Sequence, residues 1–199
     1  YLKKEEKKEL KRLNILDLGC GTGRNSNYLA LLGNTVVGID ISKIAIDIAK
    51  KRASEMQIDS SVNYIVGDIG ACYPFSDNYF DLILDITSSN SLNEKERENY
   101  IKEVYRALKK DGYLFVRALC KDGDKNAKNL LKLSPGKEYD TYVIKELNLV
   151  ERVFSEKDFK EFYGNYFKIK KLLKKSGYAK FQNQSYKRNY WLVYMQKTS

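Results

Sequence analysis

Three glycines at alternate positions, Gly19, Gly21 and Gly23, separate a short apolar run from a stretch of helical composition. The apolar run, residues 13–18, predicts a strand, and residues 24–32 predict a helix. Glycine is needed where the backbone turns sharply or approaches a ligand with no Cβ in the way. A strand, a glycine turn and a helix in this order predict an α/β fold in which the first N–H groups of the helix face a ligand.

A second apolar run, residues 35–39, ends on Asp40, about 20 residues after the glycine turn, where a second-strand carboxylate can accept the two hydroxyls of a ribose. The dinucleotide fingerprint G-x-G-x-x-G fails, because Arg24 follows Gly23. Asp17 fits a pyrophosphate poorly and suits a cationic group, such as the ammonium of a methionine moiety. The pattern therefore predicts a cofactor that carries a nucleoside joined to a cationic group instead of a pyrophosphate.

The sequence Asp-Leu-Gly-Cys-Gly-Thr-Gly at residues 17–23 resembles the first motif of the class I S-adenosylmethionine-dependent methyltransferases, and Val-Gly-Ile-Asp at residues 37–40 resembles their second. Phe-Asp-Leu-Ile at residues 80–83 also looks like the family. The resemblance is dense from residue 13 to about residue 119 and then fades. It implies an α/β fold with a Rossmann-like, doubly wound seven-stranded sheet, mostly parallel with an antiparallel last strand. It also implies S-adenosylmethionine as cofactor and S-adenosylhomocysteine as product.

The resemblance also assigns cofactor contacts beyond the glycine turn. In the family an acid after the third strand contacts the adenine amino group, and Asp68 follows the predicted third strand, residues 62–66. A carboxylate there can accept an N–H bond on the ligand side of the sheet, although Asp68 could also serve as a turn former after Gly67. Asp85 lies at the end of the predicted fourth strand, residues 80–86. The predicted cofactor-binding residues are Asp17, Gly19, Cys20, Gly21, Gly23, Asp40, Ile41, Asp68, Ile69 and Asp85.

Small polar residues 87–91 follow the fourth strand and predict part of the wall of the reaction pocket. Arg117 is unusual in the apolar fifth strand, residues 113–119, and is either an end-of-strand position or an anion contact. The residues predicted to contact the methyl acceptor are Ser88, Asn90, Arg117 and Tyr178.

Methyl transfer from a sulfonium is an in-line displacement that requires mainly positioning and exclusion of water. The chain has no histidine, so a general base would be a carboxylate. Asp85, Glu138, Asp140 and Glu146 are candidates that no spacing singles out, and the catalytic residue therefore stays unknown. No Asn/Asp-Pro-Pro-Tyr/Phe signature and no Pro-Cys or Thr-Cys motif occurs, which argues against adenine-N6, glutamine and cytosine-C5 chemistry. Three scattered cysteines and no histidine predict no metal site.

The length of 199 residues and a hydrophobic content of 43% suit one domain, residues 1–199. We expect a cofactor-binding half at 1–119, a substrate-side insertion and helix at 120–165, and a C-terminal β-hairpin at 166–199. No apolar run reaches the roughly 18 residues of a membrane span. Together with the unpaired cysteines, this predicts a reduced, cytoplasmic setting without a membrane partner.

Further elements are predicted from periodicity and capping residues. Residues 1–11 alternate Lys and Glu and predict a polar helix. Longer or capped helices are expected at 42–56, 92–110 and 155–163, and the hairpin strands at 166–175 and 188–196, joined by a loop at 176–187.

Residues 162–199 contain no Asp or Glu but nine Lys or Arg, which account for nearly all of the net charge of +10. Aromatic residues alternate with lysines in the joining loop. This combination suits unpaired RNA bases and phosphates, a lid over a small molecule, or lysine-rich solvated strands. We favour a small-molecule acceptor, with RNA as the alternative. A protein that binds the cofactor without catalysis is a third reading.

Overall fold

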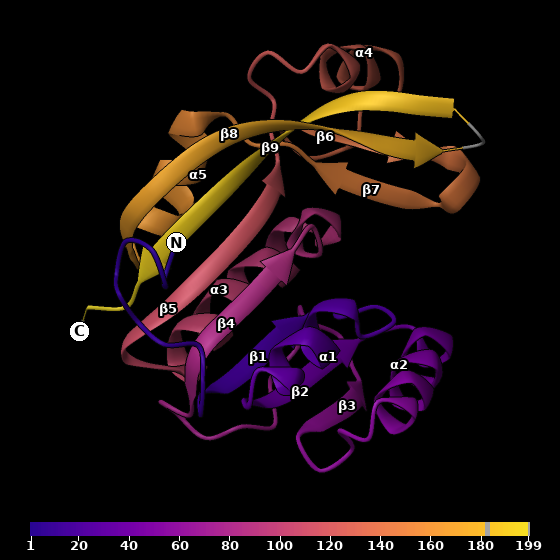
Figure 1. The fold of residues 1–199 in the computed structure, drawn as a ribbon. Coiled ribbons are helices and arrows are strands. Elements are labelled where there is room, and N and C mark those ends of the chain that lie inside the picture. The colour runs from indigo at the N-terminus through magenta and orange to yellow at the C-terminus, as the bar shows by residue number, and fades with distance from the viewer. Residues whose placement is uncertain (182–183, 199) are drawn as a thin grey trace.

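The computed structural model describes residues 1–181 and 184–198 (Figure 1). Seven strands form one sheet in the order β3-β2-β1-β4-β5-β9-β8. Strands β1 to β5 are parallel, and β9 is antiparallel to both β5 and β8. The predicted Rossmann-like sheet is therefore confirmed. The strands span Asn14–Leu18 (β1), Thr35–Asp40 (β2), Val62–Val66 (β3), Phe80–Ile86 (β4), Leu108–Leu119 (β5), Lys168–Phe181 (β8) and Gln184–Gln196 (β9).

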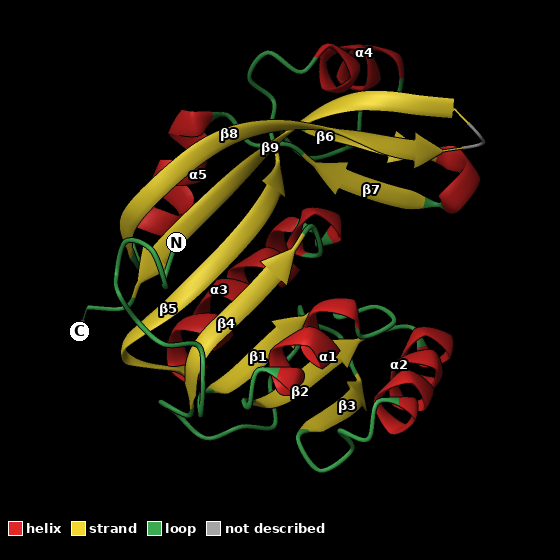
Figure 2. Ribbon diagram, in the orientation of Figure 1, coloured by secondary structure: helices red, strands yellow, loops and turns green. Residues whose placement is uncertain are grey.

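Helices cover both faces of the sheet (Figure 2). Alternate residues of β1 enter different cores, because neighbouring side chains of a strand point to opposite faces. Ile15 packs with residues of α1 and α2, whereas Leu16 and Leu18 pack with residues of α3 and α5. An uninterrupted apolar run is thus what a strand buried on both sides requires. The helices span Arg24–Leu31 (α1), Lys43–Glu55 (α2), Glu94–Ala107 (α3) and Glu156–Gly164 (α5).

The stretch between β5 and α5 adds elements that the sequence pattern did not specify. They are α4 (Lys125–Leu133) and an antiparallel hairpin of β6 (Thr141–Ile144) and β7 (Leu149–Arg152), with the short 3-10 helix η2 (Lys145–Leu147) between them. Helix α4 contacts β9 and β6, and β7 contacts the 3-10 helix η1 (Ser89–Ser91) that follows β4. The insertion therefore lies over the carboxyl ends of the central strands (Figure 1).

Three predicted elements are wrong. Residues 1–11 form turns and irregular chain, because the Lys/Glu alternation offers no apolar stripe and only Tyr1, Leu2 and Leu10 of this segment pack on the core. The helix expected at 92–110 ends at Ala107, where β5 already begins. The loop expected at 176–187 is mostly strand, since β8 and β9 stay paired out to Phe181 and Gln184, which satisfies their backbone groups. Residues 182 and 183 lie outside the described chain.

None of the helices within the described residues is both long and apolar enough to cross a bilayer.

Helix α3 begins with a capping box, which fixes the end of the chain segment that follows β4. The side chain of Asn93 accepts a hydrogen bond from the Glu96 N–H at 2.9 Å, and the Glu96 carboxylate accepts one from the Asn93 N–H at 2.8 Å. We expect Asn93→Ala to lower the free energy of unfolding by about 1 kcal/mol in urea denaturation. Asn99 is an exposed position in the same helix, and Asn99→Ala should not lower the free energy of unfolding, because alanine favours helix. Equal effects of the two substitutions would contradict this role for the cap.

Candidate functional site

The glycine turn leaves the start of α1 open. Gly19, Gly21 and Gly23 have φ of 68°, 53° and 78°, a region that other residues adopt only with strain. Gly23 is the N-cap of α1 and has no side chain, so it makes no capping bond to the first N–H groups of the helix. A Cβ at Gly21 would meet no atom within 4 Å, whereas one at Gly19 would lie 2.0 Å from the Ser88 Oγ. The turn is therefore open to a ligand at Gly21 and closed at Gly19.

Asp40 ties the end of β2 to this turn. One carboxylate oxygen accepts a hydrogen bond from the Gly21 N–H at 2.8 Å, and the other accepts one from the Ser42 N–H at 2.9 Å. The side chain is only partly buried, and each oxygen can accept one more hydrogen bond. Ile41, the next residue, is 74% exposed, which leaves an apolar surface beside the carboxylate.

The predicted residues after β1 and β3 lie along the same edge of the sheet. Asp68 is exposed, and its carboxylate accepts a hydrogen bond from the Gly70 N–H at 2.8 Å. The neighbouring Ile69 is buried in the core. Cys20 is also buried, and its N–H donates to the Ile39 carbonyl at the end of β2. Carboxyl ends of parallel strands are where ligands bind in open α/β sheets.

Asp17 and Asp85 are fully buried, unlike Asp40 and Asp68. Asp17 accepts a hydrogen bond from the Ser26 hydroxyl at 2.6 Å, which joins the end of β1 to α1. Burial, together with the nearby charge of Asp85, raises the pKa of Asp17 to about 6. Asp85 accepts hydrogen bonds from two backbone N–H groups of the turn after β4 and from the Tyr100 hydroxyl, and burial raises its pKa. Both carboxylates therefore hold a turn in place.

The turn after β4 contains two of the four residues predicted to contact the acceptor. The Ser88 hydroxyl donates to the Gly19 carbonyl at 3.3 Å, so this turn touches the glycine turn. The Asn90 amide is buried and donates to the Arg152 carbonyl in β7 at 2.8 Å. Thr87 has φ of 62°, which is a strained conformation for a β-branched residue.

The other two predicted acceptor residues lie apart from each other. The Arg117 guanidinium stacks on the Tyr190 ring, 3.8 Å from its centroid, and has no carboxylate partner within the described chain. Tyr178 is 75% exposed. Its neighbour Ala179 lines a cavity near the ends of β4 and β5. Because successive side chains of a strand point to opposite faces, Tyr178 points away from that cavity.

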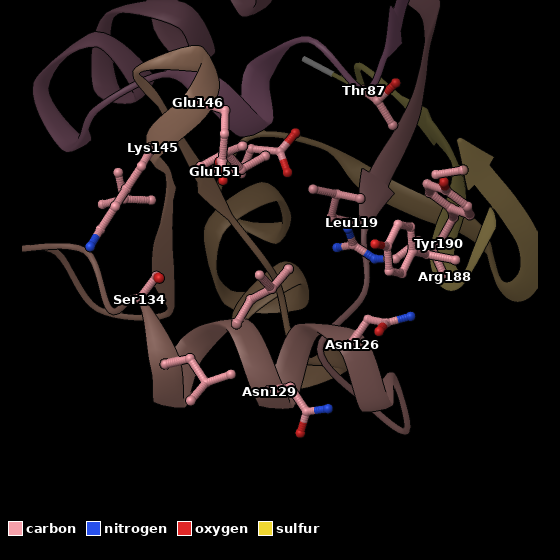
Figure 3. A pocket seen from close by; sticks show the side chains of 16 residues that line it. Thr87, Leu119, Asn126, Asn129, Ser134, Lys145, Glu146, Glu151, Arg188 and Tyr190 are labelled. Carbon is pink, nitrogen blue, oxygen red and sulfur yellow. The ribbon is translucent and has the colours of Figure 1, made fainter. Parts of the chain in front are cut away.

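A cavity of about 600 Å³ lies between the turn after β4 and the insertion (Figure 3). Thr87 and Leu119 contribute from the ends of β4 and β5, and Tyr190 contributes from β9. The opposite wall comes from α4, β6, η2 and β7. The lining combines aliphatic and aromatic side chains with amides and carboxylates, which is typical of a site for a small organic molecule.

The carboxylates that sequence suggested as bases occupy different settings. Glu138 pairs with the buried Arg97 at 3.5 Å, and Asp140 pairs with Lys121 at 2.7 Å. Of this group, only Glu146 lines the cavity.

Sequence reasoning missed Glu151 and Tyr142, which belong to the same cavity wall: Glu151 lines the cavity, and the Tyr142 hydroxyl donates a hydrogen bond to it. Tyr142 also contacts Arg188, which was noticed only as part of a basic tail. These residues come from three separate segments, so no spacing in the chain could have grouped them.

Part of the C-terminal basic charge has partners inside the protein. Lys170 pairs with Glu6 at 3.3 Å, and Lys171 pairs with Glu5. Lys197 is buried and donates to backbone carbonyls of α3 and β5. These lysines stabilise the fold rather than present free charge.

A family model described as "Methyltransferase domain" matches residues 16–116, from β1 into β5. The chain belongs to this family. An uncharacterized methyltransferase of Schizosaccharomyces pombe is 37% identical over 105 residues, which cover 53% of this methyltransferase and 70% of the relative. The ubiquinone biosynthesis O-methyltransferase of Pelagibacter ubique is 35% identical over 114 residues, which cover 57% of this chain and 45% of that enzyme. A solved S-adenosylmethionine-dependent methyltransferase of Methanosarcina mazei, 25% identical, superposes with a TM-score of 0.80 over 94% of this chain and 93% of its own.

This methyltransferase is therefore a class I enzyme that uses S-adenosylmethionine. The residues present fit that cofactor. Gly21 leaves open space where a Cβ would stand, the start of α1 carries no side-chain cap, and Asp40 retains capacity for two further hydrogen bonds beside an exposed apolar residue.

The raised pKa of Asp17 predicts a pH-dependent stability. The unfolded carboxyl titrates near pH 4 and the folded one near pH 6, so its contribution to stability is present at low pH and is lost as the pH rises through 6. Asn at this position stays neutral and can accept the Ser26 hydrogen bond. We expect Asp17→Asn, relative to wild type, to gain roughly 2–3 kcal/mol in free energy of unfolding between pH 4 and pH 7. A difference that is constant across this range would contradict a buried, titrating Asp17.

Proposed function

We propose that this methyltransferase transfers the methyl group of S-adenosylmethionine to a small molecule held in the cavity at the end of β4 and β5. The observation that carries the proposal is the position of the cavity, whose lining begins at Thr87 in the same turn that touches the glycine turn. Its volume of about 600 Å³ suits a small organic molecule. The similarity to the O-methyltransferase of Pelagibacter ubique supports a small-molecule acceptor.

We further propose how the predicted cofactor residues divide their roles. Asp40 binds the ribose hydroxyls, and Ile41 covers one face of the adenine, because it is exposed beside that carboxylate. Asp68 accepts a hydrogen bond from the adenine amino group. Gly21 lets the cofactor approach the backbone closely. The buried Asp17 carboxylate attracts the ammonium of the methionine moiety electrostatically across the glycine turn.

The bound cofactor supplies an activated methyl group on a sulfonium. The protein's own contribution is to hold the acceptor in line with it and to exclude water. Asp85 fixes the backbone of the turn that separates the two ligands, through its hydrogen bonds to two N–H groups. The apolar part of the cavity lining, such as Leu119 and Tyr190, keeps water away from the reacting groups.

Two glycines with positive φ and open Cβ positions provide a matched test of the cofactor site. Gly21 and Gly33 have φ of 53° and 88°, and a Cβ would meet no atom within 4 Å at either. Gly33 lies beyond the C-terminal end of α1, away from the proposed site. We expect both Ala substitutions to cost roughly 1–2 kcal/mol of stability. Only Gly21→Ala should also weaken S-adenosylmethionine binding, measured by calorimetry, by at least about tenfold.

The acceptor class is tested with methyl-labelled S-adenosylmethionine and a cell extract divided into small-molecule, RNA and protein fractions. Label should enter the small-molecule fraction. Label confined to a nuclease-sensitive fraction would replace this proposal with the RNA alternative. A result in which none of the three fractions supports cofactor turnover would also contradict a small-molecule acceptor.

A further inference from the structure

A chain of hydrogen bonds runs through the wall of the cavity and ends on Glu151. The Tyr142 hydroxyl donates to the Glu151 carboxylate at 2.5 Å, and Arg188 donates to the Tyr142 hydroxyl oxygen at 2.9 Å. The Nε–H group of Arg188 donates to the Asp124 carboxylate at 3.3 Å. Three elements that wall the cavity, β6, β7 and β9, are connected in this way.

The chain passes from the protein interior to the cavity. Tyr142 and Asp124 are buried, Arg188 is 8% exposed, and only Glu151 is partly open. Burial and the nearby Glu151 raise the pKa of Tyr142, so its hydroxyl stays protonated and donates. Arg188 forms an ion pair with Asp124 and interacts with the charge of Glu151 only beyond ion-pair distance. Glu151 is therefore the charged member of this chain that forms no ion pair within the described residues.

One oxygen of Glu151 has no partner within the described chain. Its hydrogen bond to Tyr142 uses the other oxygen, and no lysine or arginine of the described residues forms an ion pair with it. The cavity lining is mixed, with polar residues such as Asn126, Lys145 and Glu146 beside apolar ones, and a partly buried carboxylate oxygen is costly unless a ligand or water donates to it. The surrounding side chains include Leu119, Val143 and Tyr190.

We propose that Glu151 binds a hydroxyl or ammonium group of an acceptor that otherwise has an apolar body. Tyr142 and Arg188 are positioning residues that hold the carboxylate in place through their hydrogen bonds, and Figure 3 labels Glu151 and Arg188 in the cavity lining. The proposal rests on the proposed function, since it takes the cavity as the acceptor site. A purely structural role, in which the chain only fastens the β6–β7 hairpin to β9, predicts no preference for ligands with a hydrogen-bond donor.

The test uses three probes with similar apolar bodies: 4-ethylphenol carries a hydroxyl, phenethylamine carries an ammonium, and 4-ethylanisole carries no donor. Each is titrated by NMR into the full chain saturated with S-adenosylhomocysteine. We expect wild type to bind at least one donor probe about tenfold more tightly than 4-ethylanisole. Which donor probe binds better distinguishes a hydroxyl from an ammonium acceptor.

Glu151→Gln should abolish this preference. The Tyr142 hydroxyl would donate to the amide oxygen, which turns the NH2 group toward the cavity and leaves no acceptor there for the donor of the probe. Tyr142→Phe should reduce the preference, because the carboxylate loses its anchor. Both variants should retain wild-type affinity for 4-ethylanisole and S-adenosylhomocysteine, which shows that they are folded. Glu98→Gln, on the exposed side of α3, is the matched control and should keep the preference.

A preference that persists in Glu151→Gln would overturn the proposal, and so would wild type binding none of the probes while saturated with S-adenosylhomocysteine. Failure of wild type to bind S-adenosylhomocysteine at all would instead count against the proposed function.

Discussion

The close approach of Gly19 to Ser88 determines how the two halves of the site meet. Strands β1 and β4 are neighbours, with Leu18 opposite Asp85, so the turns that follow them start side by side. They can touch only because residue 19 has no side chain, since a Cβ there would overlap the Ser88 hydroxyl at 2.0 Å. The glycine turn and the turn that borders the cavity therefore form one continuous surface.

Four carboxylates at the ends of four adjacent strands divide into two kinds. Asp17 and Asp85, on the central strands, are buried; Asp17 accepts a hydrogen bond from the Ser26 hydroxyl in α1, and Asp85 accepts one from the turn that follows β4. Asp40 and Asp68, on the outer strands, keep oxygens open to the outside. Burial raises the pKa of both carboxylates, and the nearby charge of Asp85 adds to the rise at Asp17, which is tolerated because both carboxylates accept hydrogen bonds. The same residue type thus builds the site in the centre and is open to a ligand toward the edge.

Most of the sheet could be predicted from sequence because its parallel strands appear as short, mainly apolar runs separated by turn-forming residues. The runs at 62–66 and 80–86 coincide with β3 and β4. The glycine turn and Asp40 were also predictable, because local backbone geometry and strand order determine where they lie.

The N-terminal segment and the hairpin were harder to predict. Alternating Lys and Glu indicate a helix only if an apolar stripe accompanies them, and residues 1–11 have none. Residues 176–187 include Ser, Gly, Asn, Gln and Lys, a composition typical of a loop, but backbone pairing of β8 with β9 makes most of them strand. Glu151 was missed because its setting depends on Tyr142, Arg188 and Asp124, whose proximity arises only from tertiary structure.

The central claim, that the carboxyl ends of these strands bind S-adenosylmethionine through Asp40, is tested most directly by calorimetric titration of wild type and Asp40→Asn. Asparagine keeps one oxygen for the Gly21 N–H, so the turn should persist while ribose recognition is impaired. The account predicts binding to wild type and at least about tenfold weaker binding to the variant, with a similar thermal midpoint. Equal affinities for the two proteins would contradict it.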